Sequence, residues 1–157
     1  MSFYSDQAAK FSQMASDIET RLVNEGATMD AATYKNLSAQ EEDLDDQANE
    51  MIAADIKGTL AGLNVDQTRL AKCTDTLNAA VKTLKRFDQV AAVAAAAITL
   101  ATACASGDPG AIATAVVGAE KAVAAATAKT LVVAMPAPAP AAGLAIAASA
   151  DPAKPKN

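Results

Sequence analysis

Residues 90–119 read VAAVAAAAITLATACASGDPGAIATAVVGA, and the expected fold is arranged around them. The only charged residue here is Asp108, which lies in the segment SGDPG at 106–110. Glycine suits the left-handed position that ends a helix, aspartate caps the start of a helix, and proline fits a first helical turn. The segment therefore predicts a turn between two apolar helices, that is, a helical hairpin. The predicted turn residues are Gly107, Asp108, Pro109 and Gly110.

The spacing of apolar residues predicts that the rest of the chain is also helical. Helices are expected over residues 5–24, 30–57, 64–105 and 109–133. The third of these carries an uninterrupted heptad pattern, so we expect one straight helix of about 60 Å that forms the spine of the molecule. On that helix Cys73 and Cys104 lie about 46 Å apart, which excludes a disulfide and predicts two buried, reduced thiols.

The predicted fold class is all-α. We expect an elongated antiparallel helical bundle or coiled coil of about four helices, with the apolar hairpin 90–119 at one end. The helical part covers residues 1–133. The remaining residues, 134–157, begin with a Pro/Ala-rich stretch that ends helical structure, and they are expected to form a disordered tail.

The composition argues against catalysis and against nucleic acid as a partner. The chain has no histidine, which removes the usual neutral-pH base and every imidazole metal ligand. A net charge of −5 opposes binding to a phosphate backbone. We therefore expect no enzymatic activity, no cofactor and no nucleic-acid partner.

An acid-rich run at residues 41–46 is the one pattern that suggests a metal site. It lacks the alternating spacing of a calcium loop, and charge runs on helices are usually solvated, so no metal site is predicted. If the helix over 30–57 folds back on the next one, this run lies opposite basic residues, with Glu50 near Lys72.

The hairpin is expected to be the functional contact surface. Helices over 5–24 and 30–57 are long enough to cover only the charged half of the predicted spine, so the uncharged half beyond residue 90 lacks a cover. The predicted function is a non-enzymatic interaction or assembly protein that forms a homo-oligomer or binds a helical protein. The predicted contact residues are Val90, Val93, Ile98, Leu100, Ile112, Val116 and Val117.

Two resemblances of pattern supply alternatives. An uncharged hairpin on a charged helical stalk, over residues 65–130, resembles the heads of α-helical pore-forming toxins and of bacterial translocator proteins. That resemblance implies a membrane-active protein whose hairpin inserts into a lipid surface. The Ala-rich helices with a Pro-Ala-Lys tail more distantly resemble phasins, which implies a granule coat. The third alternative is that the stretch is simply core, or a dimer interface, in a soluble bundle.

The N-terminal residues predict the site of synthesis. MSFYSDQAAK lacks the basic and apolar regions of a Sec signal peptide, so we expect synthesis in the cytoplasm. The resemblance to translocator proteins adds export by a route that needs no such signal.

Overall fold

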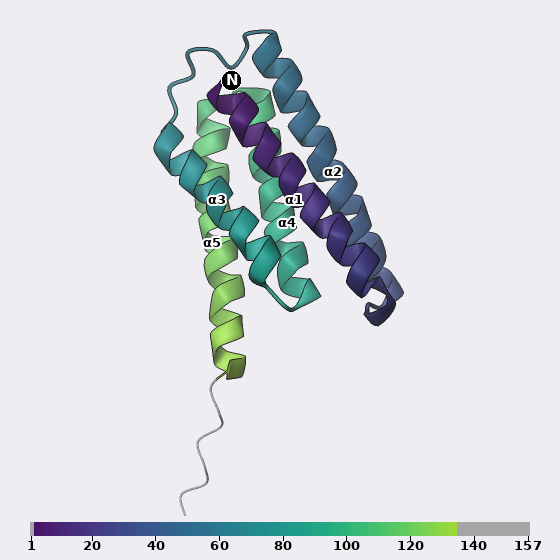
Figure 1. The fold of residues 1–157 in the computed structure, drawn as a ribbon. Coiled ribbons are helices and arrows are strands. Elements are labelled where there is room, and N and C mark those ends of the chain that lie inside the picture. The colour runs from purple at the N-terminus through teal and green to yellow at the C-terminus, as the bar shows by residue number, and fades with distance from the viewer. Residues whose placement is uncertain (1, 135–157) are drawn as a thin grey trace, which may run out of the picture.

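The computed structural model describes residues 2–134, and no strand occurs among them. Five α-helices pack together and account for nearly all of this part of the chain (Figure 1). The all-α prediction is confirmed, whereas the predicted tail lies outside the described residues from residue 135 onward. The helices are α1 (Phe3–Glu25), α2 (Ala31–Ile56), α3 (Gln67–Thr83), α4 (Phe87–Ser106) and α5 (Pro109–Ala134), with a 3-10 turn at Gly26–Thr28.

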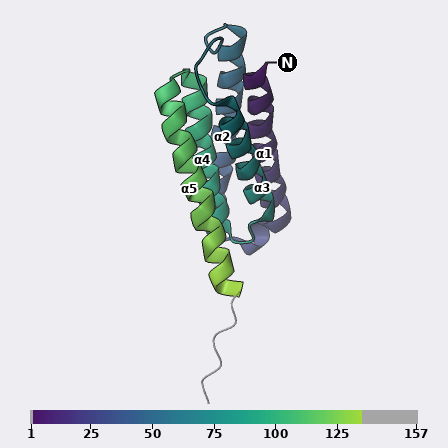
Figure 2. The same cartoon turned by 90° about the vertical axis from the view of Figure 1, so that its left-hand side faces the viewer.

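The apolar helix α4 is the central element of the fold. It packs mainly against α2 and α5 and also contacts α3 and α1, while α1 packs against α2 and α3. Its side chains Val90, Val93 and Leu100 are fully buried. Helix α5 lies at the edge, against α4 and α3, and its C-terminal part extends beyond the neighbouring helices (Figures 1 and 2).

The single long helix predicted over residues 64–105 is wrong, because the chain reverses between α3 and α4. Leu84 and Arg86 both adopt extended backbone, with ψ of 130° and 128°. A straight helix would leave the apolar residues of α4 in water, whereas the reversal surrounds them with the other helices. Burial of one large aliphatic side chain stabilises a fold by about 1.5–3 kcal/mol, which outweighs an unbroken heptad pattern.

The reversal also changes the relation between the two cysteines. With α4 folded back beside α3, Cys73 and Cys104 no longer lie at the two ends of one helix, so the predicted separation is wrong. Both thiols are nonetheless free and buried, as predicted.

Arg21 of α1 holds the two helix ends at this reversal. Its Nη1 donates a hydrogen bond of 2.9 Å to the carbonyl oxygen of Val81, in the last turn of α3, where carbonyl groups have no helical partner. Its guanidinium group also lies over the ring of Phe87, 5.9 Å from the ring centroid, at the first residue of α4. A single side chain therefore contacts both helices that flank the break.

The basic residues of α3 face α1 and α5, which corrects the expected pairing with the acid-rich helix α2. Lys72 lies near Glu120 of α5, whose pKa is lowered by Arg69 and, less strongly, by Lys72. It is not paired with Glu50, and among the described residues no ion pair involves the run at 41–46. The ion pairs between α1 and α3 are Lys10–Asp75 (2.6 Å) and Lys82–Asp17 (3.4 Å).

The predicted turn between α4 and α5 is confirmed. Gly107 ends α4 with φ of 68°, a left-handed conformation that favours glycine, and Pro109 begins α5. The carboxylate of Asp108 accepts hydrogen bonds from the backbone N–H groups of Gly110 (2.8 Å) and Ala111 (3.3 Å). The hairpin as a whole is not a projecting tip, however, because α4 runs through the middle of the helices and only the turn lies at one end.

Candidate functional site

Most of the residues predicted to form a contact surface lie in the core. The reversal between α3 and α4 puts the large side chains of the hairpin among all five helices, so they are not available to a partner in this conformation. Ile98 is half-buried, and Val117 is 37% exposed. Their contact role stays a prediction. The buried members of the set are Val90, Val93, Leu100, Ile112 and Val116.

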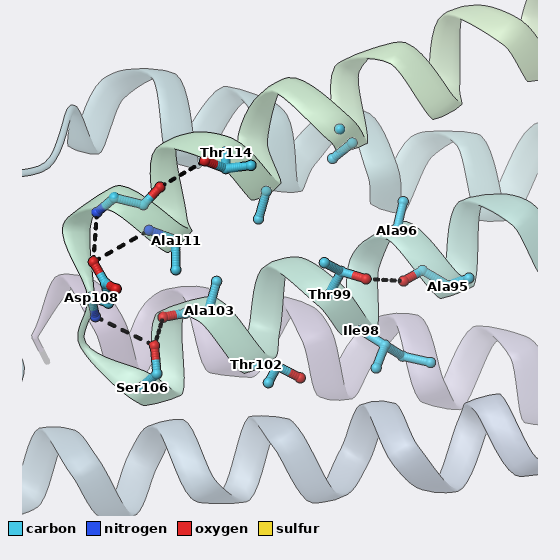
Figure 3. A pocket seen from close by; sticks show the side chains of 14 residues that line it. Ala95, Ala96, Ile98, Thr99, Thr102, Ala103, Ser106, Asp108, Ala111 and Thr114 are labelled. Atoms are coloured by element: carbon cyan, nitrogen blue, oxygen red, sulfur yellow. Dashed lines mark hydrogen bonds between the residues drawn. The ribbon is translucent and has the colours of Figure 1, made fainter.

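A groove of about 950 Å³ runs along the other face of the hairpin, between α4 and α5 (Figure 3). We call it the α4–α5 groove. One wall consists of Ala95, Ala96, Ile98, Thr99, Thr102, Ala103 and Ser106 of α4. The other consists of Asp108 in the turn and of Gly110, Ala111, Thr114, Ala115, Gly118 and Ala119 of α5.

The groove exists because nearly all of its side chains are short. Alanine, threonine and glycine recur every three or four residues along one face of each helix, so both walls end close to the backbone. At Gly118 a methyl group would meet no atom within 4 Å. The groove can therefore accept the side chains of another helix at close range.

Three of the four residues that carry a hydroxyl group in the groove donate hydrogen bonds to backbone carbonyl groups of their own helices. Thr99 donates to the carbonyl oxygen of Ala95, and Thr114 to that of Gly110, each at 2.9 Å. Ser106 donates to the backbone carbonyl of the residue three positions before it, at 2.7 Å. The two threonines consequently direct their methyl groups away from these bonds (Figure 3).

The one charged lining residue, Asp108, lies at the end of the groove and caps α5. The other lining residues are small or apolar, apart from one serine and three threonines. The arrangement can exclude water from an apolar partner.

The cysteines form no reactive site. Burial raises the pKa of the Cys73 thiol to about 11 and that of the Cys104 thiol to about 12, so both remain protonated near neutral pH. Across residues 2–134, no three His, Cys, Asp or Glu side chains come together as a metal site requires.

A polar site lies between α3 and α5 beside the groove. Arg69 and Glu120 form a two-bond ion pair, with N–O distances of 3.0 and 2.7 Å, on the surface above Cys73. The pair joins α5 to α3 at the surface.

Both helices of the hairpin are long and apolar enough to cross a membrane, judged by length and composition alone. Buried core helices pass the same test, and half of the apolar window of α4 is buried in this fold, against 28% of the window of α5. With 20 residues, α4 has about the length that crosses the hydrocarbon core of a bilayer.

No protein family model, curated protein or solved structure matches this chain.

The sequence-based prediction missed the groove because it placed the contact surface at the large apolar residues. Those residues mark the faces of α4 and α5 that turn inward. The signal for the groove was present in the small residues at Ala95, Thr99 and Thr102 and at Thr114 and Gly118, which share helical spacing.

Proposed function

We propose that this protein is a non-enzymatic helical assembly protein, and that its copies associate through the α4–α5 groove. The observation that supports this most is the groove itself: a long, apolar hollow of about 950 Å³ on the surface, with a single charge at its end.

A second copy is a suitable occupant because one large hydrophobic side chain lies exposed next to the groove residue Gly118. Val117 of α5 is 37% exposed, the most exposed large hydrophobic side chain described on α4 or α5. A two-fold axis would bring Val117 of each copy against the groove of the other, as in an isologous dimer. Burial of apolar surface contributes about 2.5 kcal/mol per 100 Å², so a few hundred Å² would drive association.

Charged substitutions at exposed positions of the groove test this function. Ala95→Glu and Thr102→Glu place a carboxylate in the groove, and both positions are exposed, so the fold should be retained. Ala79→Glu, at an exposed position of α3 outside the groove, is the matched control. Sedimentation equilibrium from micromolar to millimolar concentration gives the association constant.

We expect the wild type and Ala79→Glu to self-associate alike, and each groove variant to associate at least about tenfold more weakly, which is about 1.4 kcal/mol. Equal association of all four proteins would reject the groove as the interface. A wild type that remains monomeric at every concentration would reject self-assembly.

A second candidate function is insertion of the hairpin into a lipid bilayer. It is supported by the length and apolar composition of two consecutive helices joined by a tight turn. Since half of the apolar window of α4 is buried, insertion would require α4 to leave α2. Release of dye from lipid vesicles, accompanied by faster hydrogen exchange in α2, would favour insertion. Intact vesicles at neutral and acidic pH would exclude it.

A further inference from the structure

The loop between α3 and α4, residues 84–86, differs from the other connections between the helices. It reads Leu-Lys-Arg, three residues that favour a helix, whereas each of the other three connections contains glycine. The side chain of Arg86, at the N-cap position of α4, makes no capping hydrogen bond. The other four described helices are each capped at their start by a side chain, from Ser2, Asp30, Asp66 and Asp108. The local sequence therefore encodes a stop at every described connection except this one.

The heptad pattern of α3 also continues through this loop into α4. One of its two apolar positions is occupied in succession by Leu70, Leu77, Leu84, Ala91 and Ile98. A helix without the break would run from Gln67 to Ser106, over about 60 Å. It would pair the N–H groups of residues 85–88 with the carbonyl groups of residues 81–84, which have no helical partner at a helix end. The loop can therefore be helical as well as reversed.

A single copy does not gain from straightening this loop, because α4 would leave the other helices. Val90, Val93 and Leu100 would be exposed to water, together with the side of α2 that packs against α4. A second copy in the same state offers an identical hairpin of α4 and α5, which restores the lost contacts. Because α3 and α4 run in opposite directions from the loop (Figure 1), the two straightened helices would lie antiparallel, with α3 of each copy beside α4 of the other.

We propose that two copies exchange their α4–α5 hairpins, and that residues 84–86 are helical in the exchanged dimer. Each hairpin then packs on α1, α2 and α3 of the partner copy. The contacts of Arg21 with Val81 and Phe87 favour the reversed loop, so they oppose the exchange. The proposal goes beyond the proposed function and does not rest on it, since α4 and α5 move together and the groove between them is unchanged.

Exchange differs from association through a surface in its concentration dependence and in its rate. Within one copy the tethered hairpin has an effective concentration in the millimolar range, so exchange requires protein at about 1 mM. Helix α4 must also leave its buried position, so exchange requires unfolding, and an exchanged dimer separates slowly after dilution. Refolding from urea at about 1 mM, followed by gel filtration at micromolar concentration, isolates dimers of this kind.

The ion pair between Arg69 and Glu120 reports whether the hairpins are exchanged. Its two bonds, of 3.0 and 2.7 Å, join α3 to α5, so they connect the parts of the chain before and after the loop. Arg69→Glu and Glu120→Arg each place like charges opposite one another within a single copy. An exchanged dimer with one copy of each variant places opposite charges together at both sites. Both side chains are about half exposed, so each variant should fold.

The two variants are mixed in urea and refolded together, and the persistent dimers are analysed by native mass spectrometry. We expect heterodimers to outnumber homodimers about threefold or more, because exposed charge pairs contribute modestly but both sites act together. The control mixes Lys10→Glu with Asp75→Lys, whose ion pair of 2.6 Å joins α1 to α3 and lies entirely before the loop. Exchange cannot bring these opposite charges together, so the control should give equal numbers of heterodimers and homodimers, as random pairing does.

Equal numbers of heterodimers and homodimers from Arg69→Glu with Glu120→Arg would overturn the proposal, as would the absence of any dimer that persists after dilution. Reversible association that Ala95→Glu weakens, without a persistent dimer, would support the groove and reject the exchange. Persistent heterodimers, without reversible association of the wild type, would support the exchange and reject the groove as an interface.

Substitutions at the exposed residue Lys85 test whether the loop becomes helical. Lys85→Pro blocks a continuous helix, and the preceding residue, Leu84, already has the extended backbone that proline requires, with φ of −66° and ψ of 130°. Lys85→Ala removes the same charge and favours a helix. We expect Lys85→Pro to give at least about tenfold less persistent dimer than Lys85→Ala, with Lys85→Gly between them. Equal yields from the three variants would overturn the helical loop.

Discussion

Replacement of Arg21 by methionine tests why the chain reverses between α3 and α4. Methionine retains the aliphatic stem and removes the guanidinium group, which bonds to the carbonyl of Val81 at 2.9 Å and lies 5.9 Å from the ring centroid of Phe87. The side chain of Arg21 is only 16% exposed, so water replaces these contacts poorly.

The expected loss in the free energy of unfolding is about 2–3 kcal/mol. A hydrogen bond from a charged donor contributes about 1.5–3 kcal/mol, and a cation–π contact at a partly exposed site adds about 0.5–1 kcal/mol. The pair with Glu25, one helical turn away, contributes about 0.3–0.5 kcal/mol. In the variant the carbonyl group of Val81 can bond to water, so the expected loss in the free energy of unfolding is smaller than the sum of these three contributions.

Urea unfolding followed by circular dichroism measures the loss. The control is Arg86→Met, which removes the same charge from the loop between α3 and α4, where Arg86 is 54% exposed and pairs with Asp88. That exposed pair contributes about 0–1 kcal/mol. A double-mutant cycle of Arg21→Met with Phe87→Leu should give a coupling energy of about 0.5–1 kcal/mol. If Arg21→Met costs no more than Arg86→Met, Arg21 does not hold the reversal.

Three further predictions concern the thiols, the glycines and the acidic surface. Cys73 and Cys104, with pKa values of about 11 and 12, should react slowly with a thiol reagent at about pH 8, because about one thiol in a thousand or fewer is ionised there. Both thiols should react once the protein is unfolded. Fast reaction of the native protein would contradict their burial. Gly107→Ala should lower the free energy of unfolding by about 1 kcal/mol because Gly107 has a positive φ. Gly118→Ala should stabilise α5 by about 0.5–1 kcal/mol, because alanine favours a helix and its methyl group meets no other atom, and it should weaken self-association. Denaturation measures the stability of both variants, and sedimentation measures the association. Burial, followed by the nearby carboxylates, raises the pKa of Glu41 above its unfolded value, so the ionised carboxylate destabilises the folded state. Glu41→Gln should therefore raise the free energy of unfolding at neutral pH by a few tenths of a kcal/mol. A difference in that free energy between variant and wild type that does not shrink as the pH falls through this pKa would refute the explanation.

The sequence predicted the local features of the fold well because they depend on neighbouring residues. The helix end at Gly107 and the start at Pro109 follow from backbone preferences that act within one turn. These signals need no knowledge of the rest of the chain.

The reversal at residues 84–86 could not be predicted in this way. Leu84 keeps the heptad position that a continuous helix would use, and it is buried in the reversed chain as well, so its pattern fits both structures. What distinguishes them are contacts with residues distant in the sequence: the burial of the α4 side chains among the other helices, and the bond from Arg21, 60 positions before Val81. Because the heptad pattern runs through the break, it predicts exposed large side chains on α4 and gives no sign of the groove lined by small ones.

Distances between spin labels on two copies test most directly whether copies meet through the α4–α5 groove. Labels are attached at Ala92→Cys, an exposed position of α4 one helical turn before the groove residue Ala96, and separately at Ala53→Cys on the exposed face of α2, while the buried native thiols remain unlabelled. Because packed helices lie 8–10 Å apart, we predict label-to-label distances within about 20 Å for position 92 and much longer ones for position 53. Short distances at position 53, with long ones at position 92, would show that copies associate through a different face.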